Sequence, residues 1–309
     1  MRALATRRQV LQGTAAGLVA AACARLSSAQ SATELAFTDL GSDLALLSGA
    51  GANVVALGAA DGVLLVDGGA AAQGTAVLGR LEQRWPGRRV EILFNTNWRD
   101  EHVGANEAVR AAGGTVMAHE NTKLWLGGDF FVDWEDRHYA PRPAGLLPNK
   151  TFYTSGALDF GGRHVEYWHF PRAHTDGDVA VFFPHANVLV ASDLLSVSRY
   201  PVPDYATGGW IGGLIDASKA LLAKTDARTR IVGAHGAVYG RREVEAQLAL
   251  CAAVAQKVAE GFRVGMSRED FLASKPTAAF DAQWGDPQLF LKLVYKGAFA
   301  HLRELGGVI

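Results

Sequence analysis

The 309-residue chain contains only two cysteines, which is too few for a disulfide framework or for a cysteine-rich zinc or iron–sulfur site. It also lacks an excess of charge of either sign, with 30 Lys and Arg against 31 Asp and Glu. This balance gives no general attraction to nucleic acid or to an anionic membrane. No glycine-rich segment has the spacing or the lysine of a phosphate-binding loop. Any metal chemistry must therefore use the nine histidines and the carboxylates.

The first 29 residues have the pattern of a cleavable export signal. Arg7 and Arg8 precede an apolar run over residues 13–24, and small residues follow at 27–29. The run is shorter than the roughly 20 residues that cross a hydrocarbon core, so we expect no membrane anchor after cleavage. Paired arginines are typical of the twin-arginine signal and predict a periplasmic or secreted protein. The alternative is a basic N-terminus on a cytosolic enzyme.

The remaining chain, residues 34–309, is predicted to form a single domain in which strands alternate with helices. Short apolar runs at 44–48, 53–57, 62–67 and 90–95 predict strands. Between the last two, apolar residues at helical spacing predict a helix. Further strands are predicted at 165–170, 179–183 and 188–192, and a further helix around Cys251, which we expect in the core. This alternation is typical of a layered α/β architecture.

Two aromatic-rich stretches stand out from this pattern. Residues 125–150 show little periodicity, and a loop of this length is usually a functional lid or poorly ordered. Residues 200–205 carry two tyrosines and two prolines. Their aromatic side chains either line an apolar substrate pocket or hold the loops against the surface, and the sequence leaves both interpretations open.

Four polar clusters fall where strands should end, at residues 97–102, 173–178, 191–193 and 233–236. Loops at strand ends converge on one edge of an α/β sheet, where ligands and catalytic groups collect. A single histidine beside glycine is most often a hydrogen-bonded turn residue. Three histidines with several carboxylates on such loops favour a divalent-metal site, because imidazole and carboxylate are ligands that suit zinc.

Residues 95–106 read Asn-Thr-Asn-Trp-Arg-Asp-Glu-His-Val-Gly-Ala-Asn and resemble the metallo-β-lactamase superfamily signature, Asn-Thr-His-x-His-x-Asp-His-x-Gly-Gly-Asn. The segments 67–69, 174–178, Asp193 and 235–236 match the other motifs in order, so the similarity spans about residues 38–239. The resemblance implies an αββα sandwich of two β-sheets between helices. It also implies a hydrolase of amides, lactones, thioesters or other esters.

The resemblance departs from the family pattern at the first metal. The family holds that metal with three histidines, and the matching positions here are Asn97, Arg99 and His174. Arg99 is permanently charged and has no lone pair to offer. A first zinc should therefore be absent or weak.

The second metal site keeps more of its ligands. Glu101 stands where the family has Asp, and His102, His235 and Asp193 complete the set that the resemblance implies, with His174 as a further possible ligand. These side chains are adequate for one zinc ion, with iron and redox chemistry as an alternative. A zinc-bound water would then attack a carbonyl carbon.

The predicted function is hydrolysis of a small-molecule substrate by one zinc ion. We assign Glu101, Arg99 and Asp193 as catalytic residues, and Asn97 and Arg99 as substrate-binding residues. Arg99 either takes the place of the missing cation, pairing with Asp193 and gripping the substrate, or neutralises leftover carboxylates. The competing hypothesis is a binding protein on the same fold that has lost catalysis.

Overall fold

The computed structural model describes residues 34–301. The predicted export signal, residues 1–29, lies outside the described residues. The described residues from Leu35 onward belong to one compact unit. Within this part of the chain, no helix is long and apolar enough to cross a membrane.

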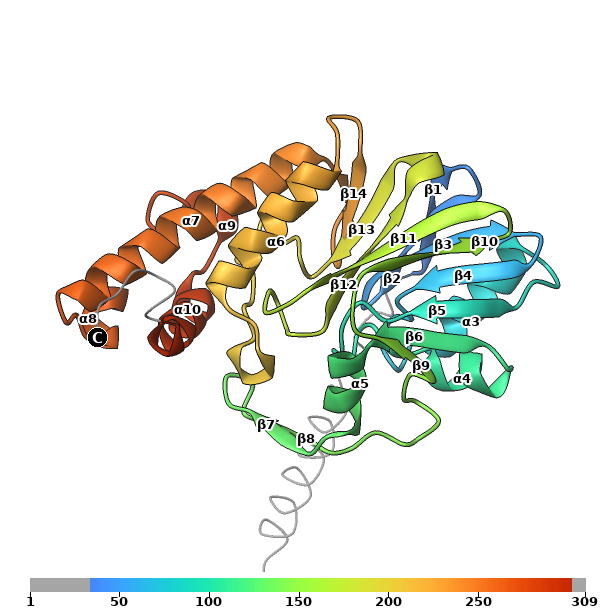
Figure 1. The fold of residues 1–309 in the computed structure, drawn as a ribbon, viewed down its shortest axis with the longest axis horizontal. Helices are drawn as coiled ribbons and strands as arrows, with labels where there is room; N and C mark the ends of the chain where they lie inside the picture. Colours follow the sequence, from blue (N-terminus) through green and yellow to red (C-terminus); the bar gives the residue numbers. More distant parts are fainter. Residues whose placement is uncertain (1–33, 302–309) are drawn as a thin grey trace, which may run out of the picture. The chain divides into compact units, whose positions relative to one another are not determined.

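Most of the strands belong to two sheets (Figure 1). The first sheet contains β1 (Ala36–Gly41), β2 (Leu44–Ala50), β3 (Ala52–Ala59), β4 (Gly62–Val66), β5 (Val90–Phe94), β6 (Thr115–His119) and β9 (Lys150–Phe152), in this order across the sheet. The second contains β10 (Gly156–Phe160), β11 (Arg163–Phe170), β12 (Asp178–Phe183), β13 (Val188–Ser192), β14 (Arg230–Gly233) and β15 (Val238–Tyr239), also in order. The strands β7 (Phe130–Val132) and β8 (Arg137–Tyr139) form a separate hairpin.

The helices are distributed between the strands along the chain. They are α3 (Gly74–Arg84), α4 (Asn106–Ala111), α5 (Glu120–Gly127), α6 (Ile211–Lys224), α7 (Arg241–Arg263), α8 (Arg268–Ala273), α9 (Asp281–Trp284) and α10 (Gln288–Ala300). Two short 3-10 turns are η2 (Pro184–Ala186) and η3 (Tyr205–Thr207).

The central strands are apolar on both faces because both faces are covered. On β4, Leu64 and Val66 belong to the core between the two sheets, whereas Val63 and Leu65 pack on the opposite face beneath α3. Such uninterrupted apolar strands are typical of sheets that are buried on both sides.

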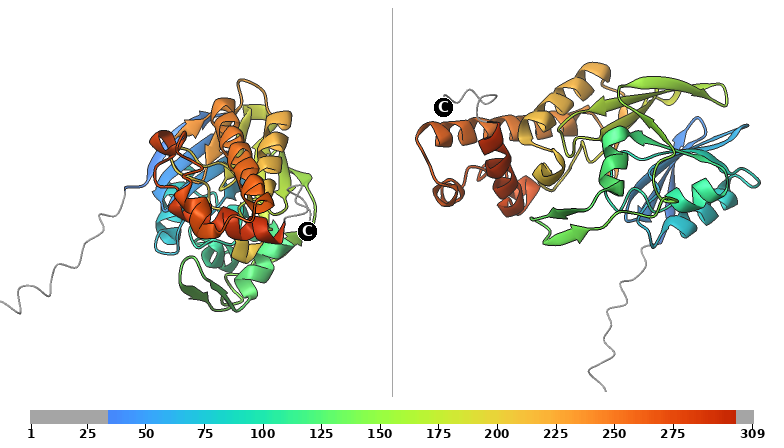
Figure 2. Two further views of the ribbon diagram at one scale, coloured as in Figure 1. Left: turned by 90° about the vertical axis from the view of Figure 1, so that its left-hand side faces the viewer. Right: turned by 60° about the horizontal axis from the view of Figure 1, so that its bottom comes forward.

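Helices cover the outer face of each sheet. Val77 of α3 and Val109 of α4 pack against the first sheet, and Leu214 of α6 and Val254 of α7 pack against the second. Figure 2 shows α7 and α10 (orange and red) lying together on the side of the second sheet. The predicted four-layer αββα sandwich is therefore confirmed. The buried position predicted for Cys251 is confirmed as well.

The aromatic stretch at 125–150 is more regular than its sequence suggests. It contains the end of α5 and the β7–β8 hairpin, whose turn carries Trp134. Phe130, Tyr139 and Trp98 pack together with ring centroids 4.8 to 5.4 Å apart. The stretch therefore forms secondary structure and is not the irregular loop that its sequence predicts. Contacts with Trp98, which follows β5, stabilise the hairpin although its own sequence has little periodicity.

Parallel strands joined by helices determine where the site lies. The units β4–α3–β5 and β13–α6–β14 both place parallel strands side by side. The carboxyl ends of such strands lie at the same edge of a sheet. Asp67, the 95–102 segment, Asp193 and His235 all follow these ends, as predicted.

A stacked histidine pair lies near the start of α5. The rings of His119 and His169 are 3.6 Å apart between centroids, at an angle of 8°. Nδ1 of His119 accepts the backbone N–H of Asn121, and Nε2 lies 3.2 Å from the carbonyl oxygen of Tyr153. Burial and the neighbouring His169 lower the pKa of His119, and burial also lowers the pKa of His169.

This pair predicts a loss of stability in mild acid. Because both pKa values lie below the ordinary 6.5, the folded protein binds fewer protons than the unfolded chain there, so stability is present above pH 6.5 and is lost as the pH falls. Thermal unfolding followed between pH 8 and pH 5 should show this loss. His169→Gln should reduce it, whereas the same change at the exposed His164 should not. An equal pH dependence in all three proteins would contradict this interpretation.

Candidate active site

Side chains from both sheets meet around one cavity of about 210 Å³ at the carboxyl ends of the strands. Its lining residues are Arg99, Glu101, Trp134, His174, Asp193, Ser196, Arg199, Tyr200, Val202 and His235. Five of the predicted site residues are therefore brought to one cavity: Arg99, Glu101, His174, Asp193 and His235. Asn97 and His102 do not line it and act on Asp193 from behind.

His102 is clamped between two carboxylates. Its Nδ1 lies 2.9 Å from Asp67 Oδ2, and its Nε2 lies 2.7 Å from Asp193 Oδ2. The imidazole is fully buried. Although burial disfavours its charged form, Asp67 and Asp193 raise the pKa of His102 well above its usual value. The ring is therefore protonated, and its single positive charge is shared between the two carboxylates.

The two strand ends that carry these carboxylates are strained. Asp67 has a φ of 63° and Ser192, directly before Asp193, has a φ of 49°. Non-glycine residues in this left-handed region cost on the order of 1–3 kcal/mol each and persist where the surroundings impose them. Asp67 is held by the backbone N–H and the hydroxyl of Thr96, each donating to its carboxylate at 2.8 Å. Backbone strain of this kind is typical of functional sites.

Asn97 donates its side-chain N–H to Asp193 Oδ2 at 2.9 Å. The side-chain Oδ1 of Asn97 accepts the backbone N–H of Arg99, which orders the loop after β5. Asp193 Oδ2 thus contacts both the side-chain amide of Asn97 and the imidazole of His102. Despite burial, His174 and His102 keep the pKa of Asp193 well below its usual range, so this carboxylate is ionised.

Arg99 does not pair with Asp193, contrary to the sequence-based expectation. Its guanidinium forms ion pairs with Glu135 in the hairpin turn and with Asp204, the latter at 3.6 Å. Its Cζ lies 4.9 Å from the ring centroid of Trp98 and 5.0 Å from that of Trp134. Although burial opposes its charge, the surrounding carboxylates raise the pKa of Arg99. The carboxylates that Arg99 neutralises, Glu135 and Asp204, therefore lie outside the superfamily motifs.

His174 is oriented by its backbone surroundings. Its Nδ1 lies 2.5 Å from the carbonyl oxygen of Val202. Because a carbonyl oxygen can only accept a hydrogen bond, Nδ1 carries a proton and donates it. Its Nε2 is buried, makes no hydrogen bond, and lies 3.9 Å from Asp193 Oδ2. Asp178 accepts the backbone N–H groups of His174 and Thr175 and so holds the turn, as predicted for one of its two aspartates.

His235, Arg199 and Glu101 are uncommitted polar groups of the cavity. Among residues 34–301, no hydrogen bond or ion pair involves any of these three side chains. Burial and the charge of Arg199 lower the pKa of His235, so its imidazole is neutral at pH 7. Glu101 also lines the cavity and acts on His235 only through its charge. A neutral imidazole and a free guanidinium thus face the same space.

The residues present do not fit the zinc site that the resemblance implies. In the described part of the chain, no group of three or more His, Cys, Asp or Glu side chains is arranged to hold a metal ion. Both ring nitrogens of His102 contact carboxylates, and Asp193 Oδ2 already accepts Asn97. The guanidiniums of Arg99 and Arg199 line the same cavity and would repel a metal cation. One zinc ion held by Glu101, His102 and His235 stays a prediction.

The sequence-based assignment missed several lining residues. Trp134 and Tyr200 lie in the two aromatic stretches that were considered as pocket walls, and they do line the cavity. Arg199 follows the motif residue Asp193 in the same loop, and a charged residue so close to a motif could have been predicted to line the site. Glu135 and Asp204, the partners of Arg99, carried no such signal because neither lies in a motif.

A family model described as the metallo-beta-lactamase superfamily matches residues 48–235, more than half of the chain. This chain belongs to the metallo-β-lactamase superfamily. Members of the superfamily are mostly hydrolytic enzymes and usually bind zinc. No curated protein matches the chain.

Solved structures of superfamily members share the fold. The metallo-beta-lactamase from Pontibacter korlensis aligns with a TM-score of 0.58 at 19% identity, over 71% of this chain and 99% of that one. The stereoselective inverting sec-alkylsulfatase Pisa1 from Pseudomonas sp. aligns with a TM-score of 0.65 at 17% identity, over 85% of this chain and 50% of that one. At these identities the likeness shows the fold alone.

Proposed function

We propose that this superfamily member hydrolyses an acyl bond, of the ester, lactone or amide type, in a small molecule bound in the 210 Å³ cavity. The observation that carries the proposal is the pairing of a neutral, unbonded imidazole on His235 with a free guanidinium on Arg199 in one cavity. Strained backbone at Asp67 and Ser192 supports a site that still functions, because a site that has lost its function has no need to maintain a conformation that costs stability.

In the proposed mechanism, the chain's own side chains carry out the reaction. His235 takes a proton from a water molecule as the oxygen of that water attacks the carbonyl carbon, and returns the proton to the leaving group. Arg199 donates a hydrogen bond to the oxygen that gains negative charge. The charged His102 holds Asp193 in place behind the cavity, and Arg99 holds the hairpin turn above it.

The zinc-dependent mechanism predicted from the sequence remains the alternative route to the same reaction. The buried, unbonded Nε2 of His174 beside Asp193 is the observation that favours it. No step above depends on zinc. A binding protein without catalysis is the second candidate, supported by the loss of the histidines at positions 97 and 99. Export through a twin-arginine signal also remains a proposal.

The test uses purified protein with chromogenic esters, a lactone and a β-lactam, and measures its metal content. We expect ester hydrolysis above the buffer rate, loss of that activity in His235→Gln, and no change after dialysis against a chelator. Activity that disappears with the chelator and returns with zinc would overturn the metal-free route. Binding of these compounds without any turnover would favour the binding protein.

A further inference from the structure

Glu101 lines the 210 Å³ cavity without a partner of its own. Its carboxylate makes no hydrogen bond or ion pair within residues 34–301, although its charge acts on both His235 and Arg99. An ionised carboxylate can only accept hydrogen bonds. Glu101 therefore has acceptor atoms in the cavity for which the described chain supplies no donor.

Two other residues that line the cavity, Asp193 and His174, also have acceptor atoms without a donor. Asp193 contacts Asn97 and His102 through Oδ2 alone, and its Oδ1 makes no hydrogen bond in the described part of the chain. His174 is 5% exposed, its Nδ1 donates to Val202, and its Nε2 has no partner. Because buried polar atoms without partners cost free energy, these acceptors indicate a ligand that supplies the missing donors.

The charges around the cavity do not cancel. Each of the two cations that are committed to ion pairs lies between two carboxylates. They are His102, between Asp67 and Asp193, and Arg99, between Glu135 and Asp204. Glu101 and Arg199 add one charge of each sign. Among these residues the carboxylates therefore exceed the cations, which favours a positively charged group on the substrate.

A primary ammonium group fits these acceptors better than a zinc ion does. It has three N–H donors and no acceptor, and each donor can reach a separate oxygen or nitrogen atom. Zinc instead requires three or four ligands around one point, and no such group is found among residues 34–301. Arg199 also repels a single positive charge half as strongly as it repels a divalent ion.

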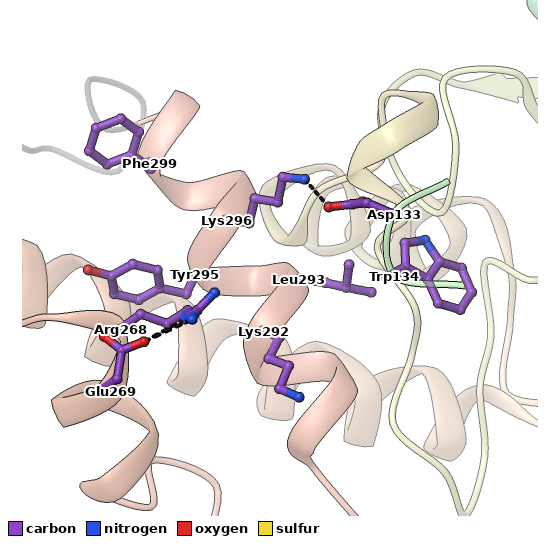
Figure 3. Close-up of a pocket in the computed structure, with 9 residues that line it drawn as sticks. All are labelled: Asp133, Trp134, Arg268, Glu269, Lys292, Leu293, Tyr295, Lys296 and Phe299. Atoms are coloured by element: carbon purple, nitrogen blue, oxygen red, sulfur yellow. Dashed lines mark hydrogen bonds and ion pairs between the residues drawn. The ribbon is translucent and has the colours of Figure 1, made fainter. Parts of the chain in front are cut away.

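The size of the cavity restricts the rest of the substrate. Its volume of 210 Å³ lies below the roughly 300–1,000 Å³ of pockets that enclose a drug-sized ligand. Trp134 forms one wall, and the turn that carries it is tied to α10 by the ion pair of Asp133 with Lys296 (Figure 3). The indole N–H of Trp134 donates to Asp204 at 2.9 Å. Because this wall is held by both contacts, we expect the cavity to stay small and to exclude bulky groups.

We propose that Glu101 and Asp193 Oδ1 bind an ammonium group of the substrate, with His174 Nε2 as the third acceptor, while the adjacent carbonyl group lies at His235. This inference rests on the proposed function and names its substrate class, the esters and amides of small α-amino acids with a free amino group. Arg199 keeps its role at the oxygen that gains negative charge. Water adds its hydroxyl to the acyl carbon, the leaving alcohol or amine takes the proton, and the free amino acid is released.

The test compares alanine ethyl ester with ethyl propionate at pH 7, because these esters differ only in the amino group. Hydrolysis is followed by proton release with protein dialysed against a chelator, and each kcat/KM is divided by the uncatalysed rate constant of its ester. A hydrogen bond between charged groups contributes about tenfold or more, so we expect a preference of at least about tenfold for the alanine ester.

Variants at position 101 assign this preference to the carboxylate. Glu101→Gln keeps the shape of a partly exposed side chain and should lower the preference by about tenfold. Glu101→Asp keeps the charge on a shorter side chain and should give an intermediate preference. The control is Glu107→Gln, the same change at an exposed position of α4 outside the cavity, which should leave the preference unchanged.

Binding without turnover separates the possible failures. Calorimetry compares alanine with propionate, and tighter alanine binding that weakens in Glu101→Gln supports the ammonium site even if neither ester is hydrolysed. In that case only the proposed hydrolysis fails. Equal use of the two esters, equal binding of the two acids, or a preference unchanged in Glu101→Gln would overturn the ammonium site and leave the hydrolytic proposal intact. A preference that appears only after zinc is added would overturn it too, because the metal would then hold the amino group.

Discussion

Replacing His235 by glutamine is expected to lower kcat/KM for ester hydrolysis by about 10²–10⁴-fold, the usual contribution of a general base. The physical reason is that His235 is the neutral imidazole that faces the cavity without a hydrogen bond of its own, and glutamine cannot accept a proton at neutral pH. Because burial and the charge of Arg199 lower its pKa, activity should rise with pH below 6.5 and level off above it.

The pH profile distinguishes catalysis from structural support. In His235→Gln the rise of activity below pH 6.5 should vanish along with most of the rate, whereas a merely structural residue would leave the shape of the profile unchanged. The same substitution at the exposed His164 serves as the control and should leave both rate and profile unchanged. Activity of His235→Gln within threefold of the original protein would exclude His235 as the base.

Replacing Arg99 by alanine is expected to lower the free energy of unfolding by about 3–5 kcal/mol, the usual cost of removing one partner of a buried ion pair. Arg99 is 7% exposed, and its partner Asp204 is fully buried, so the variant leaves a carboxylate uncompensated away from water. The contacts with Trp98 and Trp134 are lost as well, which should release the hairpin turn from the cavity.

Denaturant unfolding of three proteins checks this prediction. Arg99→Lys keeps the charge but loses the planar group that lies between the two tryptophans, so its loss of stability should be intermediate. Arg137 in the β7–β8 hairpin pairs at 2.6 Å with the partly exposed Asp100. Arg137→Ala removes this cation and should lower the free energy of unfolding by no more than about 1 kcal/mol. Equal losses in Arg99→Ala and Arg137→Ala would show that the buried pair has no special role.

Part of the site was predictable because motif residues follow strand ends. The strands before Asp67, Asn97, Asp193 and His235 are short apolar runs, and parallel strands bring their carboxyl ends to one edge whatever the loops do. The convergence of these residues therefore follows from periodicity and spacing. The placement of His102 between two carboxylates is a further step, since it depends on contacts across the whole fold.

The partners of Arg99 show where such prediction ends. Its motif position suggested Asp193, but Asn97 and His102 already occupy that carboxylate, and the guanidinium reaches Glu135 and Asp204 instead. Glu135 lies in a hairpin turn with no periodic pattern, and nothing local indicates that this turn folds over the end of β5. The zinc ligand set was implied by the family resemblance, and within residues 34–301 its members contact one another and no group of them is arranged around a metal, so the set stays a prediction.

The sequence by itself determined the αββα architecture, the superfamily and the edge of the sandwich at which the site lies, because these depend on local patterns of apolar residues and on motifs of neighbouring residues. Only the tertiary structure decided which charges meet there. The few cysteines restricted any metal chemistry to histidines and carboxylates, yet the pairing of these groups depends on distances between residues far apart in the chain. The contact between the hairpin turn and α10 is likewise a tertiary fact, because its ion pair joins Asp133 and Lys296, which lie 163 residues apart in the sequence.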